Sequence, residues 1–366
     1  AASEFRLIAQ AVTDYDADNG YLLAGLTLCQ VEAEVAIIHV EEWEIGVIEV
    51  EGLRRLRSRY VRSRLAPATA QPVEVPRVQE SLRLLQSDPL IETFAATLSQ
   101  DATTDTATLR LTVQEADSFN ANLSANNGRS QSIGTNEQGI GLQEANLLGF
   151  GDRLAVSYDR TEGTNSFAGS YTIPLTPQNT TLGLSYATSD SAIIQPPFDE
   201  FDIDSNSRYY DLTLRHPLMQ MPEEELALGL TLSRWETESR FLEDILGEAV
   251  PLPTRGSDDQ GQTRLSVLRF SQEWTRRDRD RVFALRSQFN LGLDVFNATI
   301  NEQSPDGQFF SWQGQAQYIQ RVSNNTLLLL RGQVQLSDRP LVPLEQFALG
   351  GVCLLYTSPS PRDQRP

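Results

Sequence analysis

The sequence contains no lysine, only two cysteines and two histidines, and no apolar run long enough for a transmembrane helix. Cys29 and Cys353 are too few and too far apart for a disulfide framework or a cysteine-based metal cluster. The longest aliphatic block, Leu327 to Leu330, falls far short of the roughly 18 apolar residues that a membrane-spanning helix requires. These absences exclude a disulfide-rich domain and a helical membrane protein, but not insertion through β-strands.

Catalytic motifs are equally scarce. His39 and His216 belong to no Cys/His cluster, no His-Glu-x-x-His motif and no Ser-His-Asp arrangement, so we interpret both as structural or surface residues. Asp202, Asp204 and Asn206 alternate as at the start of a calcium loop, but the glycine and the glutamate that such a loop requires are missing. A solvated acidic loop is the alternative. The sequence therefore predicts no enzyme, no cofactor and no metal site.

The charge balance is strongly acidic. The 49 Asp and Glu residues against 30 basic residues give a formal net charge of −19. This balance argues against nucleic acid as a partner, because phosphate backbones are bound by clustered basic residues. The 366 residues are 40% hydrophobic and 22% charged, which is typical of a folded chain of two or three domains. The sequence begins AASEF, without an initiator Met or an apolar signal segment, and we expect its true start to be missing; a processed start is the alternative.

Residues 1–117 mix helical and strand patterns. From residue 43 the order is a strand, a basic helix, a second helix bounded by prolines, and strands near 95–99 and 107–115. Residues 1–42 contain a helical pattern at 5–12 and two strand-like runs, which fit the same order with its first strand and helix removed. We therefore predict two copies of one β-α-α-β-β module, the first truncated at its N-terminus (1–42) and the second complete (43–117).

From about residue 118, apolar residues alternate with small or polar ones. Every second residue from Leu226 to Leu232 is leucine, and Ala, Gly and Thr lie between them. This period of two predicts β-strands. We expect eleven, near residues 119, 138, 152, 166, 180, 207, 224, 262, 281, 309 and 325. Many reach the length of about 9 to 11 residues that a tilted strand needs to cross a membrane.

The connections between these strands alternate in length. One set is short (LLGFGD, TPQN, MQMPEE, RRDRD and SNN), whereas the other is mostly long and polar, as in QPPFDEFDIDSNS. Short turns on one rim and long loops on the other are typical of outer-membrane barrels. We therefore predict an α+β module region followed by a transmembrane antiparallel β-barrel, with residues 118–351 providing about 11 strands. A soluble sandwich or a lipocalin-like barrel is the alternative, because the same alternation also suits a protein core.

The stretch DRLAVSYDR (152–160) shows what each face of such a barrel would meet. Leu154, Val156 and Tyr158 are predicted to face lipid. An arginine at mid-depth on the lipid face costs about 2 to 4 kcal/mol, so the other face is predicted to line a wet lumen. We expect the following residues to face the lumen: Arg153, Ser157, Asp159, Arg286, Gln288 and Asn290.

Several segments resemble the outer-membrane translocators of two-partner secretion, the haemolysin secretion and activation (TpsB) family, in a cyanobacterial version. They are LRRLRSRYVRSRL, LLQSDPLIETFAATLS, TLRLTVQEADSF, ANLSANNG, EANLLGFGDRLAVSY and PPFDEFDIDSNSRYYDLTLRHPL. The most specific is the turn NLLGFGD after the second module. The resemblance covers residues 1 to about 351. It implies two periplasmic POTRA domains and a barrel of about 16 strands in the bacterial outer membrane. It also implies membrane lipid and a large secreted exoprotein as partners, and a monomeric full-length protein.

The resemblance further implies that the loop after the eleventh strand folds back into the lumen, with a Val-Arg-Gly-Tyr-like motif at its tip. Here RPLVPLEQFALGG (339–351) is followed by VCLLYTSPSPRDQRP, which does not alternate and resembles a translated sequencing adapter. We therefore expect residues 352–366 to be a non-native tail and the last five strands to be missing. An ordinary disordered terminus is the alternative. An incomplete barrel would leave open sheet edges with unsatisfied backbone groups in lipid.

The second module offers two candidate binding surfaces. If its second strand is a free edge, Ala96, Leu98 and Gln100 can pair with an unfolded passenger, beside Leu85 and Ile91 on the adjoining helix. The basic helix either steers an acidic passenger or contacts barrel turns through Arg54, Arg55, Arg57, Arg59, Arg62 and Arg64. The alternatives are that the first set only builds the module core and that the helix face is only solvated.

Together these features predict a passive protein-conducting channel. The POTRA domains would capture an unfolded exoprotein of haemolysin or adhesin type, and the barrel would conduct it outward. A barrel-assembly or protein-import factor of the same superfamily is one alternative. A soluble binding protein with an acidic face is the other.

Overall fold

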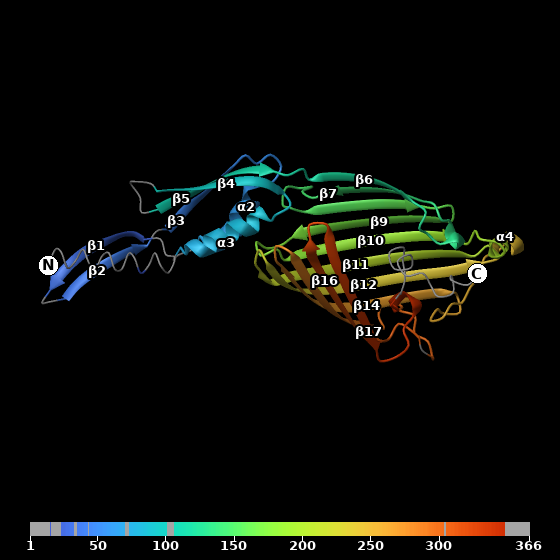
Figure 1. Cartoon of the computed structure of the whole chain (residues 1–366). Coiled ribbons are helices and arrows are strands. Elements are labelled where there is room, and N and C mark those ends of the chain that lie inside the picture. The colour runs from blue at the N-terminus through green and yellow to red at the C-terminus, as the bar shows by residue number, and fades with distance from the viewer. Residues whose placement is uncertain are drawn as a thin grey trace.

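A computed structural model describes residue 15 and residues 23–32, 35–42, 44–69, 73–100, 106–303 and 305–347. The helical pattern expected at 5–12 and the tail expected at 352–366 lie outside these residues. Of the first predicted module, the structure describes an antiparallel hairpin of β1 (Leu23–Glu32) and β2 (Val35–Glu42). Figure 1 shows this hairpin, the second module and a large curved sheet in succession.

The second module has the predicted β-α-α-β-β order. It consists of β3 (Glu44–Glu51), α2 (Ser58–Leu65), the 3-10 turn η1 (Ala66–Ala68), α3 (Val75–Gln86), β4 (Ile91–Gln100) and β5 (Thr106–Glu115). The sheet order is β3-β5-β4, with β3 parallel and β4 antiparallel to β5. The second strand in sequence, β4, therefore lies at an edge of the sheet, as the binding hypothesis required.

One face of this small sheet carries the module core. On the central strand β5, alternate residues are buried, among them Leu109 and Leu111. Val61 and Leu65 of α2 and Leu85 of α3 pack into the same cluster. α3 has Pro76 in its first turn, where the missing amide is not needed for helical hydrogen bonds.

The large sheet contains the eleven predicted strands in sequence order, each antiparallel to the next. They are β6 (Phe119–Asn126), β7 (Glu137–Glu144), β8 (Arg153–Arg160), β9 (Thr164–Pro174), β10 (Thr181–Ala192), β11 (Asp204–Gln220), β12 (Glu224–Phe241), β14 (Gln262–Arg277), β15 (Arg281–Gly292), β16 (Phe310–Ser323) and β17 (Thr326–Ser337). A two-residue strand in a long loop, β13 (Val250–Pro251), pairs with β12 and was not predicted. Among the described residues the sheet is open, with β6 and β17 at its edges.

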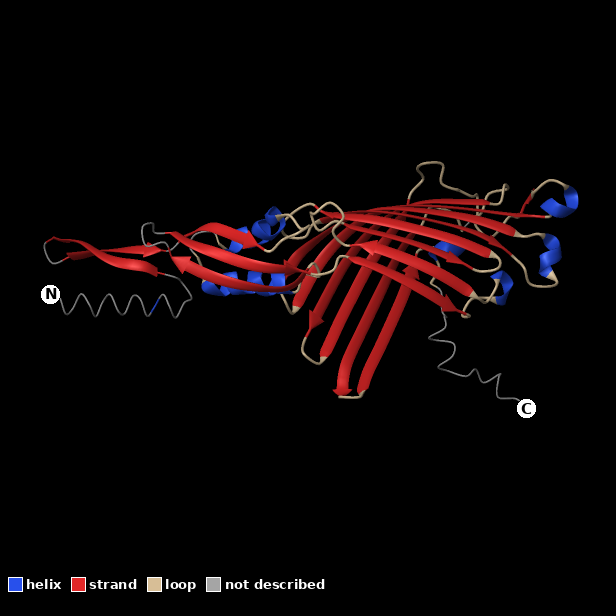
Figure 2. Ribbon diagram, turned by 90° about the horizontal axis from the view of Figure 1, so that it is seen from above, coloured by secondary structure: helices blue, strands red, loops and turns tan. Residues whose placement is uncertain are grey.

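The two sets of connections lie at opposite ends of the sheet. The short turns face the module, and the long loops lie at the far end with their short helices (Figure 2). These helices are η2 (Gln131–Ile133), η3 (Phe198–Phe201) and α4 (Glu243–Leu246). The short and long connections read from the sequence therefore lie on opposite rims of the sheet.

The strand register separates a polar face from an apolar face. On one face the cross-strand partners run Arg153, Thr172, Gly183, Thr213, Thr231, Arg269, Asn290, Ser311 and Ser337 from β8 to β17. On the other they run Leu154, Tyr171, Leu184, Leu212, Leu232, Leu268, Leu291 and Phe310. Each face is chemically uniform across the sheet, because the side-chain period of a strand is two.

The apolar face is uncovered. Leu184 and Leu232 are 58% and 52% exposed, and in the part of the chain that the structure describes no second layer packs on them. A soluble sandwich would bury such residues, so this exposure argues against the soluble alternative. None of the described helices is long and apolar enough to cross a membrane.

Candidate functional site

The turn between β7 and β8 is fixed by a buried carboxylate. Asp152 is fully buried and accepts hydrogen bonds from the amide of Leu148 (2.9 Å) and the hydroxyl of Tyr171 (3.0 Å). The side chain of Asn146 accepts another from the amide of Gly151 at 3.0 Å. These contacts organise the segment NLLGFGD (146–152), the most specific part of the sequence resemblance.

The two glycines of this turn permit close contact with the module. Gly149 and Gly151 both have positive φ (+87° and +77°), which L side chains rarely adopt. A Cβ on Gly149 would lie 2.7 Å from the carbonyl oxygen of Arg55, and one on Gly151 would lie 2.4 Å from the ring of Tyr60. The turn and the start of α2 therefore approach each other more closely than side chains would allow.

Arginines of the basic helix region make the contacts to the sheet. The amide of Arg57 donates to the carbonyl of Gly149 at 2.9 Å, and its guanidinium lies 3.9 Å from the ring centre of Phe150. Arg55 pairs with Glu144 at 2.9 Å. Arg64 donates to Asn179, in the turn between β9 and β10, at 2.6 Å. The predicted basic helix is shorter than expected, because α2 begins at Ser58 and Arg54, Arg55 and Arg57 precede it. Of the two roles considered for these six arginines, contact with the turn region of the large sheet is present for three.

The remaining three arginines form no hydrogen bond or ion pair with the large sheet among the described residues. The backbone amide of Arg54 donates to Glu115, and Arg62 donates to Ser58 within the helix. Arg59 is exposed on the same helix. Steering of an acidic passenger by this group stays a prediction.

Tyr60 stabilises the helix beside the junction. Its hydroxyl donates to Asp88 at 2.7 Å, and the guanidinium of Arg64 lies over its ring at 3.5 Å. Burial, and then the negative charge of Asp88, raise the pKa of the Tyr60 phenol. It therefore remains a neutral donor. A cleft of about 360 Å³ lies next to it, between α2, α3 and the turns near 177–179 and 220–225.

Replacing Arg57 by alanine is expected to weaken the docking of the module by about 1 kcal/mol, the usual value of a cation–π contact. The Arg57–Gly149 hydrogen bond uses backbone atoms and is retained, but it should open about fivefold more often. Hydrogen exchange at amide 57 measures this opening. Arg59→Ala, in the first turn of α2, is the matched control. An equal effect of both substitutions would contradict the assigned contact.

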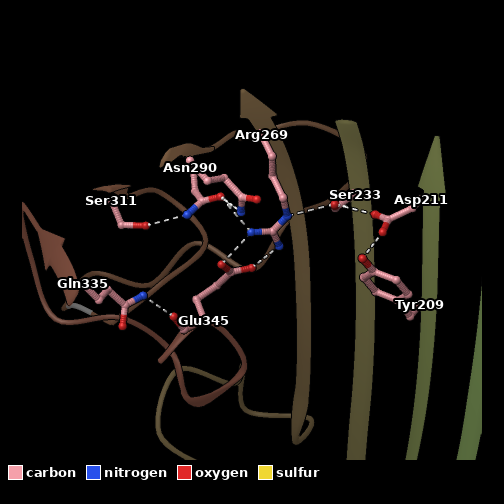
Figure 3. A network of polar contacts seen from close by, with 9 residues as sticks. Tyr209, Asp211, Ser233, Arg269, Asn290, Ser311, Gln335 and Glu345 are labelled. Atoms are coloured by element: carbon pink, nitrogen blue, oxygen red, sulfur yellow. Dashed lines mark hydrogen bonds and ion pairs between the residues drawn. The ribbon is translucent and has the colours of Figure 1, made fainter. Parts of the chain in front are cut away.

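A polar network spans the middle of the polar face (Figure 3). Arg269 of β14 forms a bidentate ion pair with Glu345 (2.5 and 3.0 Å), and the two side chains are 13% and 2% exposed. Arg269 also donates to Ser233 (3.0 Å) and Asn290 (3.1 Å). Ser233 donates in turn to Asp211 at 2.5 Å. Four strands and the segment after β17 thus share one network.

The ion pair holds the returning segment against the sheet. Glu345 belongs to η4 (Pro343–Glu345), eight residues beyond the end of β17. Its carbonyl accepts from Gln335 at 2.7 Å, and Leu341 and Val342 are buried against Leu265 and Val267 of β14. The predicted return of the loop into the curved sheet is present for the described residues up to 347. The Arg-Gly motif that the resemblance implies was expected only after Gly351, which lies outside the described residues.

The predicted lumen residues lie on one face. The register places Arg153, Ser157 and Asp159 of β8 on the same face as Arg286, Gln288 and Asn290 of β15. This is the face that carries Arg269 and Glu345. The predicted residues of β15 join the network: the amide nitrogen of Asn290 donates to Ser311 at 3.1 Å, Gln288 donates to Asn290 at 2.7 Å, and Arg286 donates to Gln288 at 2.7 Å. Sequence reasoning missed Arg269 and Glu345, because their partnership joins residues 76 positions apart.

The predicted passenger groove needs a correction. Leu85 and Ile91 are 2% and 5% exposed and form part of the module core, and Ile91 is the first residue of β4 rather than part of a helix. Leu85 contributes to the lining of the cleft beside Tyr60, not to a groove along the edge of β4. Leu98 on β4 is 44% exposed and Ala96 is also exposed, whereas Gln100 is described only in its backbone. On α3, four aliphatic residues keep partial exposure: Val75, Val78, Leu82 and Leu84.

The family model of haemolysin secretion/activation proteins (ShlB/FhaC/HecB) matches residues 105–353. The chain belongs to this family. The resemblance read from the sequence is thereby confirmed, and the family's outer-membrane location applies to the large sheet. No curated protein matched the sequence.

Three solved structures share the fold. CdiB from Escherichia coli has a TM-score of 0.71 at 20% identity, over 94% of this chain and 64% of that one. CdiB from Acinetobacter baumannii has 0.65 at 16%, over 95% and 63%. BamA from Haemophilus ducreyi, lacking POTRA domains 1–3, has 0.53 at 14%, over 92% and 64%. The chain spans slightly less than two thirds of each.

Potential metal ligands form no cluster in the part of the chain that the structure describes. Among the described residues, no group of three or more His, Cys, Asp or Glu side chains is arranged to hold a metal ion. The acidic run near Asp202 and Asp204 includes η3 and the start of β11 at the outer rim.

Proposed function

We propose that this protein is the outer-membrane translocator of a two-partner secretion system. The modules at 1–42 and 43–117 act as POTRA domains that capture an unfolded exoprotein in the periplasm. The sheet at 118–351 forms the conducting barrel. One observation carries the proposal. The second module, which has a free sheet edge at β4, docks through the turn 146–152 onto the short-turn rim of the large sheet, and that sheet is apolar on one face and polar on the other.

The edge strand β4 supplies the capture mechanism. Its outer backbone groups are free to pair with an extended chain, and peptides commonly add to such edges. Leu98 is the cross-strand partner of the buried Leu109 and lies on the same face of the small sheet, which the helices cover at other positions. Leu98 itself remains exposed. It can therefore accept an apolar side chain of the passenger.

The experiment uses cells that carry two genes: the gene of this protein and a neighbouring gene that encodes a large exoprotein. Exoprotein should accumulate in the medium, and Leu98→Glu should reduce its release severalfold without lowering the amount of translocator in the membrane. Thr93→Glu, an exposed change on the same strand, is the matched control. Release independent of the translocator gene would refute the proposal.

A barrel-assembly role is the second candidate, because the fold is also shared with BamA. Loss of the translocator would then lower the amounts of other barrel proteins in the outer membrane. The family match to secretion proteins favours the first candidate.

A further inference from the structure

The apolar face of the sheet has a hollow where β15, β16 and β17 meet. Four residues on this face are small, and the register places them side by side: Ser287 opposite Gly314, and Ala316 opposite Gly332. They form the floor of a groove of about 570 Å³. A Cβ on Gly332 would meet no atom within 4 Å, so the groove is open above this residue.

Two indoles form rigid walls of the groove. Trp312 lies across Gly314, where an added Cβ would come within 2.9 Å of the indole. Its Nε1 donates to Ser287 at 3.0 Å, and Nε1 of Trp274 donates to Glu224 at 2.7 Å. Both indoles are thus fixed in place with their polar atoms satisfied, and they present carbon to the groove. Further apolar walls come from Leu226, Leu285 and Val334.

The residues beside the groove change in character toward the short-turn rim. Phe283 packs against Trp274 and Tyr318, with ring centres 5.5 and 6.4 Å apart. Arg276 lies two residues beyond Trp274 on the same face, about 7 Å along the strand, and is exposed. An apolar groove, an aromatic row and an arginine follow one another, which is the order of acyl chain, interface and phosphate in a membrane leaflet.

We propose that this groove binds one acyl chain of a phospholipid in the periplasmic leaflet, with Arg276 contacting its phosphate. The inference rests on the membrane orientation in the proposed function. Three observations favour a lipid over other occupants. The groove is continuous with the exposed apolar belt, its lining is almost entirely carbon, and the cation lies at the end where the lipid phosphate would be.

The test counts bound lipid on the full chain. The chain is reconstituted in nanodiscs of phosphatidylethanolamine and phosphatidylglycerol, exchanged into detergent, and weighed by native mass spectrometry. The wild type should retain one phospholipid. Gly332→Leu fills the groove and should lower the retained fraction about tenfold, the effect of losing contact with about two methylene groups. Arg276→Gln should lower retention of both lipids.

Gly169→Leu is the matched control. Gly169 also lies on the apolar face, on β9, and an added Cβ there would have ordinary contacts of 3.8 Å with Phe167. Circular dichroism checks that both leucine variants retain their strands. Equal retention by the two variants overturns the proposal. A two-chain species that disappears with Gly332→Leu also overturns it, because a second copy would then occupy the groove.

A second measurement separates failure of the groove from failure of the proposed function. Phospholipids brominated on the acyl chain should quench the fluorescence of Trp274 and Trp312, in a chain whose other two tryptophans, Trp43 and Trp235, are replaced by phenylalanine. Absence of quenching would show that the apolar face does not meet lipid, and both proposals would fail. If quenching occurs but Gly332→Leu and Gly169→Leu retain lipid equally, only the proposal of a lipid-binding groove is refuted.

Discussion

Arg269→Met is expected to lower the free energy of unfolding by about 3 to 5 kcal/mol, because it leaves the carboxylate of Glu345 buried without a cation. The substitution also removes the donor to Ser233 and Asn290, so the cost extends to the hydrogen bonds around them. Urea unfolding of the chain in lipid nanodiscs measures the global effect. Limited proteolysis of residues 338–347 measures the release of the returning segment.

The double variant Arg269→Met/Glu345→Gln tests the mechanism. It removes both charges, and it should recover most of the loss, since the cost comes from an unpaired buried charge rather than from a missing attraction. Arg240→Met is the matched control. The Arg240–Glu238 pair is largely exposed and should contribute no more than about 1 kcal/mol. Equal losses for Arg269→Met and Arg240→Met would refute the role of the network.

The second large effect is expected from a charge on the apolar face. Leu214→Arg should destabilise the protein in a bilayer by about 2 to 4 kcal/mol, the cost of arginine at mid-depth facing lipid. Leu214 is 43% exposed and lies between Leu182 and Leu230 on the neighbouring strands. Unfolding in vesicles of defined composition measures the loss.

Thr213→Arg is the control, one residue away on the polar face. Thr213 lies opposite Gly183, which leaves room for a longer side chain, and the substitution should cost about 1 kcal/mol through the lost hydrogen bond to Thr231. Because the two positions are adjacent, the difference between their destabilisation energies reports whether each face of the sheet contacts lipid or water. If both arginines cost the same, the apolar face does not contact lipid.

The two candidate sites differ in how far they could be predicted. The junction turn was identified through the family resemblance of the segment NLLGFGD, and its glycines and Asp152 all lie within that one segment. The Arg269–Glu345 network was not identified, although an arginine on the polar face of an alternating strand is a local signal. Its partner comes from a different part of the chain, and no local pattern specifies which carboxylate returns to it.

The groove on the apolar face shows the same limit. Ser287, Gly314, Ala316 and Gly332 are small residues on three strands, and each alone reads as a gap in an apolar row. Only the register brings them together. The error for Leu85 has a similar origin, because the burial of a helix residue depends on which side of the helix meets the sheet. For Ile91 the element itself was wrong, since this residue begins β4.

The sequence by itself determined the β-α-α-β-β module, the eleven strands and the separation of polar from apolar residues within each strand. These features depend on helical periods and on a strand period of two, which act over a few residues. The tertiary structure alone decided which residues meet across strands, which arginines in and before α2 reach the turns, and which carboxylate neutralises Arg269. Such contacts depend on register and on chain return, which emerge only when distant segments pack.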